Sequence, residues 1–276
     1  MLPLWRDRLQ IVLTPKHVSV ARIRAGLKPR IVFKKTQSCE KPNQGEASWQ
    51  PAIRLLRQLL KQAGSAKANV EVILSNHFVR YQLIKAQPDL GGLDEEKGFV
   101  RFSFAETYGN ESEQWSYRWG SGLDIASQVA SAIDQALIES IENVLATTSF
   151  KLTSLQPYLM SAFNHIRKLI DTKPILFVLL EQGRACVALL RDGDWVSLNS
   201  SKLGPDWSAE LSNVIERELQ KIDSVQEVEN VLLCLPDYFD VKRLGNHSQS
   251  IRILTITPET LQDGKVLAIK PMEAKK

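Results

Sequence analysis

Residues 8–38 read RLQIVLTPKHVSVARIRAGLKPRIVFKKTQS, and this stretch predicts how the chain begins to fold. Three runs rich in β-branched residues, 8–13, 17–24 and 30–38, are separated by two good turn sequences, Thr14-Pro15-Lys16 and Gly26-Leu27-Lys28-Pro29. Short turns of this kind join neighbouring antiparallel strands. The stretch therefore predicts a three-stranded meander.

Strands and helices alternate after this meander. Apolar residues at helical spacing predict a helix that begins near Trp49 and ends at Gly64. Further strands are expected at 69–74, 78–84, 114–119 and 149–155, and further helices at 93–108, about 126–146 and 159–170. After 171–174 the order begins again, with strands at 175–180, 185–191, 195–198, 230–235 and 250–256 and helices at 207–222 and 238–244.

The order β-β-β-α-β-α-β thus occurs twice in the sequence. It predicts an α/β protein of two lobes, each a mixed sheet with flanking helices. This duplication resembles the lobes of actin, Hsp70 and the sugar kinases, the actin-like ATPase (RNase H-like) fold. We expect a first lobe over residues 1–170, a second over 171–276, and a small α+β subdomain inserted in the first lobe at about 87–119.

The charge and cysteine content narrow the class of protein. The net charge is +4 and the basic residues are scattered, which argues against a nucleic-acid-binding surface. These basic residues are best explained as parts of solvent-exposed faces, although they could also bind an acidic partner or lipid head groups. Cys39, Cys186 and Cys234 form no CxxC pair, which favours reduced thiols. No signal-peptide core or membrane-spanning stretch occurs, so we expect a cytoplasmic protein.

The turns that would hold a nucleotide lack the residues that ATP chemistry needs. An active turn offers a carboxylate for a metal-bound water and a glycine that lets N–H groups approach phosphate. The first turn has neither, and Pro15 removes a donor, which leaves Lys16 as a weak candidate. The second offers Glu181 and Gly183, which a plain hairpin explains equally well. A third turn, 234–238, contains Pro236 where a Gly-Gly pair would be needed. We expect no cofactor and no catalysis.

Other groups of residues give weaker signals. The four histidines are far apart and predict no metal site. Trp115, Tyr117 and Trp119 alternate, which places all three on one face of a strand. They form either the core of the inserted subdomain or a groove for an extended peptide.

Several stretches, taken in order, resemble the PilM/MshI group of actin-like proteins from type IV pilus assembly and the cytoplasmic part of the secretion protein GspL. They are residues 70–84, Pro88 with the acidic helix that ends near Tyr108, 150–159 and 187–195. The resemblance implies a non-catalytic cytoplasmic scaffold, peripheral to the inner membrane, that binds the cytoplasmic tail of an inner-membrane protein.

The resemblance also implies where that tail binds, in a groove between the first lobe and the inserted subdomain. Carried over by position, this groove involves Phe78, Arg80, Tyr81, Trp115, Tyr117 and Trp119. The alternative is a divergent ATPase or sugar-kinase-like enzyme that still uses Lys16, Glu181 and Gly183. A third possibility, an RNase H-like nuclease, is disfavoured because the strands are poor in Asp and Glu. The sequence leaves open whether the chain forms a homodimer.

Overall fold

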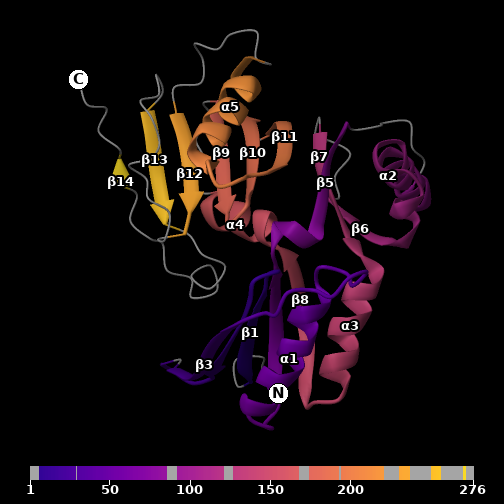
Figure 1. Ribbon diagram of the computed structural model, residues 1–276, viewed down its shortest axis with the longest axis vertical. Coiled ribbons are helices and arrows are strands. Elements are labelled where there is room, and N and C mark those ends of the chain that lie inside the picture. Colours follow the sequence, from indigo (N-terminus) through magenta and orange to yellow (C-terminus); the bar gives the residue numbers. More distant parts are fainter. Residues whose placement is uncertain are drawn as a thin grey trace. The chain divides into compact units, whose positions relative to one another are not determined.

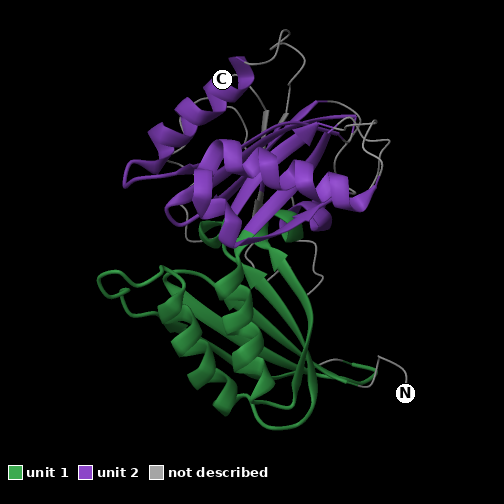
Figure 2. Cartoon of the chain, turned by 90° about the vertical axis from the view of Figure 1, so that its right-hand side faces the viewer, with its two compact units in different colours: residues 1–79, 133–161 green, residues 80–132, 162–276 purple. Residues whose placement is uncertain are grey.

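The computed structural model describes residues 6–28, 30–85, 92–120, 127–167, 174–192, 194–220, 230–236, 250–255 and 270–271. The chain forms two compact units (Figure 2). The first consists of residues 1–79 and 133–161, and the second of residues 80–132 and 162–276. The division into lobes 1–170 and 171–276 follows the duplicated order of elements and stays a prediction.

The first unit is built on a five-stranded sheet with the order β3-β2-β1-β4-β8. Its elements are β1 (Asp7–Leu13), β2 (His17–Arg24), β3 (Arg30–Ser38), α1 (Gln50–Gln62), β4 (Ala68–Leu74), α3 (Gln135–Ala146) and β8 (Phe150–Pro157). The meander β1-β2-β3 is antiparallel, whereas β4 and β8 run parallel to β1. Helices α1 and α3 lie side by side on one face of this sheet (Figure 2), where they bury Leu56, Leu59 and Ile141.

The second unit contains a sheet that repeats this strand order. Its strands lie in the order β11-β10-β9-β12-β13-β14. The elements are α4 (Tyr158–Ile166), β9 (Ile175–Glu181), β10 (Arg184–Arg191), β11 (Asp194–Lys202), α5 (Trp207–Gln220), β12 (Asn230–Leu235), β13 (Ser250–Thr255) and β14 (Lys270–Pro271) (Figure 1). Each large sheet therefore begins with a meander followed by two parallel strands, and the predicted duplicated α/β fold is confirmed.

Strand β9 of the second large sheet is buried on both faces. Leu176, Val178 and Leu180 of β9 form a core with α5, whose Leu211 and Ile215 are buried there. On the other face Phe177 lies 6.4 Å, between ring centroids, from Phe163 of α4. Strands covered on both sides read as continuous apolar runs, and every residue of β9 is buried.

A smaller sheet with the order β5-β7-β6 completes the second unit. It consists of β5 (Val79–Lys85), β6 (Trp115–Trp119) and β7 (Ser127–Asp134), and α2 (Leu93–Tyr108) packs on it. The helix predicted over 126–146 is wrong in its first part, because residues 127–134 form β7 and the helix α3 begins only at Gln135. The spacing of Val129 and Ile133 fits a helix, but pairing with β5 and β6 selects the extended form.

All three cysteines lie in described parts of the chain. Cys186 and Cys234 are buried, Cys39 is half-buried, and all three are free thiols. The helix predicted at 238–244 and the glycine at position 91 lie outside the described residues. Within the described parts of the chain, no helix is both long and apolar enough to cross a bilayer.

Candidate functional site

The turn between β1 and β2 is closed by the side chain of Thr14. Its Oγ1 accepts hydrogen bonds from the backbone N–H groups of Lys16 (3.2 Å) and His17 (2.9 Å) and donates one to the carbonyl oxygen of His17 (2.9 Å). The N–H of Thr14 donates to the same carbonyl at 3.1 Å, and Pro15 has no N–H to offer. Every backbone N–H from residue 14 to 17 is therefore either missing or bound inside the turn.

This arrangement leaves the first turn without the donors that a phosphate needs. Phosphate-binding turns present several backbone N–H groups that point outward into one concavity. Here a phosphate would first have to break the bonds to Thr14. The predicted candidate Lys16 is exposed, and its carbonyl accepts a hydrogen bond from the N–H of Cys39 at 2.8 Å. Its backbone thus ties the turn to the segment that follows β3.

The second turn is a two-residue hairpin between β9 and β10. Glu181 and Arg184 are cross-strand partners, and Gln182 and Gly183 connect them. Gly183 has φ +83°, a left-handed conformation that glycine adopts without strain. Its carbonyl accepts a hydrogen bond from the N–H of Leu203 at 3.0 Å. Hairpin geometry alone therefore accounts for the glycine that the sequence offered as a phosphate-binding candidate.

Glu181 and Arg184 are buried charged residues, and the half-buried Arg80 lies near them. Burial lowers the pKa of Arg184, nearby Arg80 lowers it further, and the carboxylate of Glu181 opposes both. The Arg184 guanidinium donates from Nη1 to Oγ of Ser200 at 3.0 Å, whereas its buried Nε has no hydrogen-bond partner among the described residues. Glu181 thus compensates a buried cation at the start of β10.

The remaining described residues offer no alternative centre for metal chemistry. Within the described ranges, no three His, Cys, Asp or Glu side chains come together as metal ligands. The thiol of Cys186 lies near Glu181 and Arg184, and burial raises its pKa to about 12. A thiol with so high a pKa is protonated at neutral pH and is a poor nucleophile.

The small sheet and α2 enclose a cluster of aromatic rings. The Phe104 ring lies 5.2 Å from that of Tyr117 and 6.3 Å from that of Trp115, between centroids, and Tyr108 is 5.1 Å from Trp115. The hydroxyl of Tyr117 donates to the carbonyl of Ser112. Strand β6 therefore directs its alternate aromatic residues into the core of this small subdomain.

The residues predicted for a partner groove differ in their exposure to solvent. Phe78, Tyr81 and Tyr117 are buried, so none of them can contact a partner without rearrangement. Arg80, Trp115 and Trp119 are half-buried and keep part of their surface exposed. Trp119 packs on the same aromatic cluster, and its Nε1 donates to Oε2 of Glu96 at 3.1 Å.

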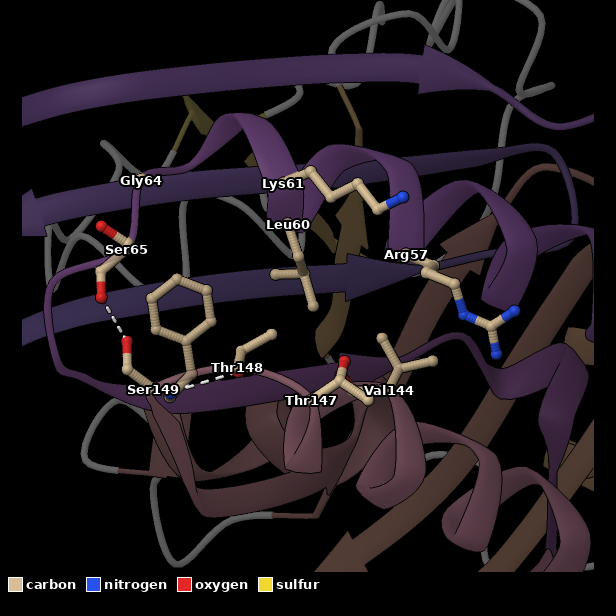
Figure 3. A pocket seen from close by; sticks show the side chains of 10 residues that line it. Arg57, Leu60, Lys61, Gly64, Ser65, Val144, Thr147, Thr148 and Ser149 are labelled. Atoms are coloured by element: carbon tan, nitrogen blue, oxygen red, sulfur yellow. Dashed lines mark hydrogen bonds between the residues drawn. The ribbon is translucent and has the colours of Figure 1, made fainter.

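A hollow in the first unit was not predicted from the sequence. A cavity of about 670 Å³ lies where α1 and α3 end and β8 begins (Figure 3). Leu60, Val144 and Phe150 supply its apolar part, and Arg57 and Lys61 supply basic groups from one side of α1. Basic side chains in the last turn of a helix complement its dipole, which explains Lys61 without a ligand.

The duplicated sheets and the two turns define the class of this protein, an α/β protein with the actin-like ATPase fold. Structures of known proteins share this fold over most of the chain. No family model matches the sequence, and no curated protein matches it.

Two of these structures come from bacterial pilus and secretion systems. One is the PilM–PilN type IV pilus biogenesis complex, with 14% identity, a TM-score of 0.62, and coverage of 82% of this chain and 80% of that chain. Another is the cytoplasmic domain of EpsL, an inner membrane component of the type II secretion system of Vibrio cholerae, with 10% identity, a TM-score of 0.58 and coverage of 94% of each chain. A Bacteroides thetaiotaomicron protein with an actin-like ATPase fold and unknown function matches with 10% identity, a TM-score of 0.55, and coverage of 88% of this chain and 87% of that chain. The resemblance noted in the sequence is thus confirmed at the level of the fold.

Proposed function

We propose that this chain is a non-catalytic cytoplasmic scaffold of a type IV pilus or type II secretion-like assembly. In this role it binds a cytoplasmic peptide tail of an inner-membrane protein and reaches the membrane through that partner. The observation that carries the proposal is the closed first turn, in which Thr14 occupies the N–H groups that ATP would need. The likeness to PilM and to the EpsL cytoplasmic domain supports the choice of assembly.

We assign the partner surface to the small sheet and to β6 in particular. β6 is an edge strand in the order β5-β7-β6, and an extended peptide can add to such an edge through its backbone. Trp115 and Trp119 alternate on β6 with exposed surface, and half-buried Arg80 lies on β5. Two tryptophans held on a rigid strand would anchor apolar side chains of a tail, since tryptophan is among the commonest hot-spot residues.

Titration with synthetic peptides tests this assignment. Peptides that correspond to the cytoplasmic tails of inner-membrane proteins encoded beside this chain are titrated into the full chain and followed by calorimetry. Trp115→Ala and Trp119→Ala are expected to weaken binding about 10- to 100-fold, the effect of losing one hot-spot side chain. Phe102→Ala is the matched control, because Phe102 is an exposed aromatic residue of the same subdomain outside the aromatic cluster.

The tryptophan variants could weaken binding by loosening the core. Trp119→Phe keeps a ring in the cluster and therefore separates the two effects, with thermal unfolding as the check on the fold. If none of the tails binds, or if the tryptophan variants bind as tightly as Phe102→Ala, the proposed surface is wrong.

A second titration addresses the enzyme alternative, in which Lys16, Glu181 and Gly183 hold a nucleotide. We expect no saturable heat with Mg-ATP, because the first turn offers no unoccupied N–H group and no carboxylate. Mg-dependent ATP binding that disappears in Glu181→Ala would favour the enzyme over the scaffold.

A further inference from the structure

The tip of the β2–β3 hairpin exposes large apolar side chains. Beyond the last cross-strand pair, Arg24 with Arg30, Leu27 is fully exposed at 104%. Ile31 and Val32, which follow in β3, are 51% and 43% exposed. Single exposed apolar residues are common on proteins, but three of the six exposed large apolar residues among the described residues lie in this one hairpin, which points to an interaction site.

Positive charge is concentrated in the same segment. Residues 8–39 hold eight of the chain's 35 Lys and Arg residues and none of its 31 Asp and Glu residues. The rest of the chain has 27 basic and 31 acidic residues and is therefore net negative by four. The basic residues that follow the course of the hairpin are Arg24, Lys28, Arg30 and Lys34, and all four are exposed.

Two of these charges face each other directly. Arg24 and Arg30 are cross-strand partners, and like charges in that position repel and destabilise a hairpin. The carboxylate of Asp7 is already engaged elsewhere, because its two oxygens accept from Nε of Arg22 at 2.9 Å and from the N–H of Ala25 at 3.1 Å. An external anion at the tip would remove this unfavourable interaction.

The basic and apolar residues of the β2–β3 hairpin are explained only in part by the need to protect a sheet edge. Edge strands often carry lysines and bulges that prevent pairing with other chains. Lys34, Lys35 and the bulge between Arg22 and Ile23 fit that purpose. Leu27, Ile31 and Val32 do not, because exposed aliphatic residues invite association rather than prevent it.

The distribution of the apolar residues favours a lipid surface over a protein or a nucleic acid. Ile31 pairs with Ile23 and Phe33 pairs with Arg22, so Val32 is the extra residue of the bulge, and Leu27 lies beyond the last pair of the hairpin. The exposed aliphatic residues thus lie next to exposed lysines and arginines at the same end of the hairpin, and this combination suits the head-group region of an anionic bilayer. Single-stranded nucleic acids are bound largely by aromatic stacking, and Phe33 is the segment's only Phe, Tyr or Trp.

We propose that the tip of the β2–β3 hairpin binds directly to a bilayer that contains anionic phospholipids. Leu27 and Ile31 enter the region between the head groups, and Arg24, Lys28 and Arg30 bind lipid phosphates. This contact is independent of the peptide tail in the proposed function. It would give the chain a second attachment to the membrane, and two weak attachments hold far better than one.

Co-sedimentation of the full chain with vesicles tests this proposal. We expect binding to vesicles of phosphatidylcholine and phosphatidylglycerol and none to phosphatidylcholine alone. Removing one basic residue near an anionic surface lowers partitioning roughly fivefold, so Arg24→Gln/Arg30→Gln is expected to bind about 25-fold more weakly. Leu27→Ser should weaken binding about tenfold through lost apolar burial. Arg57→Gln/Lys61→Gln removes the same charge from α1 of the same unit and serves as the control.

Insertion is measured separately with an environment-sensitive dye. The dye is attached to Leu27→Cys in a Cys39→Ser background, since the other two cysteines are buried. A blue shift with anionic vesicles is expected. An unshifted dye, or a control that loses as much binding as the hairpin variants, would overturn the proposal. So would hairpin variants that bind vesicles normally but lose binding to polyglutamate, because that result identifies an acidic protein as the partner. None of these outcomes depends on whether a peptide tail binds at β6.

Discussion

Replacing Thr14 with valine isolates the hydroxyl that closes the first turn. Valine keeps the shape of the side chain, so the change removes Oγ1 and little else. Two accepted bonds, from the N–H groups of Lys16 and His17, are lost together with the bond donated to the carbonyl of His17. A typical intramolecular hydrogen bond contributes about 1 kcal/mol net. Because Lys16 is exposed and water can replace part of these bonds, we expect a loss of about 1–2 kcal/mol in the stability of the turn.

Amide hydrogen exchange followed by mass spectrometry reports this loss where it occurs. A chain with two compact units need not unfold in one step, so a global unfolding free energy would mix both units. Peptides that cover residues 8–24 of Thr14→Val should exchange about 5- to 30-fold faster, the factor that corresponds to 1–2 kcal/mol. Thr14→Ser keeps the hydroxyl and should exchange like the parent chain.

The same series tests the expectation that the first turn does not bind phosphate. Thr14→Val releases two N–H groups, but Pro15 still offers none and no carboxylate is added, so we expect no gain of Mg-ATP binding. Unchanged exchange in Thr14→Val would refute the reasoning, because the N–H groups would then be available to a phosphate at no cost. A gain of ATP binding would show that Thr14 alone had closed the site.

Three further predictions concern Arg22, Gly183 and the three cysteines. Arg22→Met should destabilise the first unit by about 3–5 kcal/mol, because the partly buried carboxylate of Asp7 loses its cationic partner and the carbonyls that follow α1 lose their donors. Hydrogen exchange in α1 that stays slow would contradict this prediction. Gly183→Ala should cost about 1–2 kcal/mol through its left-handed backbone, and an unchanged melting temperature would show that the turn adapts. Burial raises the pKa of Cys186 to about 12 and raises that of Cys234 as well, so the thiolate form of both is scarce at pH 8. Iodoacetamide should therefore modify only Cys39 until urea is added. Mass spectrometry of the intact native chain shows the outcome, and label on either buried cysteine would count against the prediction.

The meanders could be predicted from the sequence because their determinants are local. Strand runs with turn residues between them specify β1, β2 and β3 without reference to any distant contact, and the predicted ranges 17–24 and 30–38 match β2 and β3. The helix prediction for residues 127–134 was wrong because their apolar residues fit both the helical period and the strand period. Val129 and Ile133 are four apart, as on a helix face, yet Ala130 and Ala132 also alternate as in a strand. Only pairing within the small sheet decides between the two, and one of the partner strands, β5, is distant in sequence.

The candidate site was predicted less completely because side-chain contacts decide it. The sequence shows that Pro15 lacks a donor, but it does not reveal that Thr14 uses the neighbouring donors. The burial of Phe78 and Tyr81 could not be predicted from the sequence either. The alternating pattern of a strand assigns a residue to one face of the sheet, but it does not show what covers that face. The basic residues looked scattered because no run exceeds a pair, and the hairpin brings Arg24 and Arg30 together across six positions.

The two turns lack phosphate chemistry for different physical reasons, and this difference bears on what the chain does. In the first turn the backbone donors exist but are bound by Thr14, and a proline removes one. In the second turn the glycine remains but is required by an ordinary two-residue hairpin, while Glu181 compensates the buried charge of Arg184. No single substitution would give both turns the residues of a phosphate-binding turn, so such a change would need coordinated substitutions at two sites. In the proposed scaffold the fold is selected for its surfaces rather than for a bound ligand, and the edge of β6 and the tip of the β2–β3 hairpin are the two surfaces that we propose for binding.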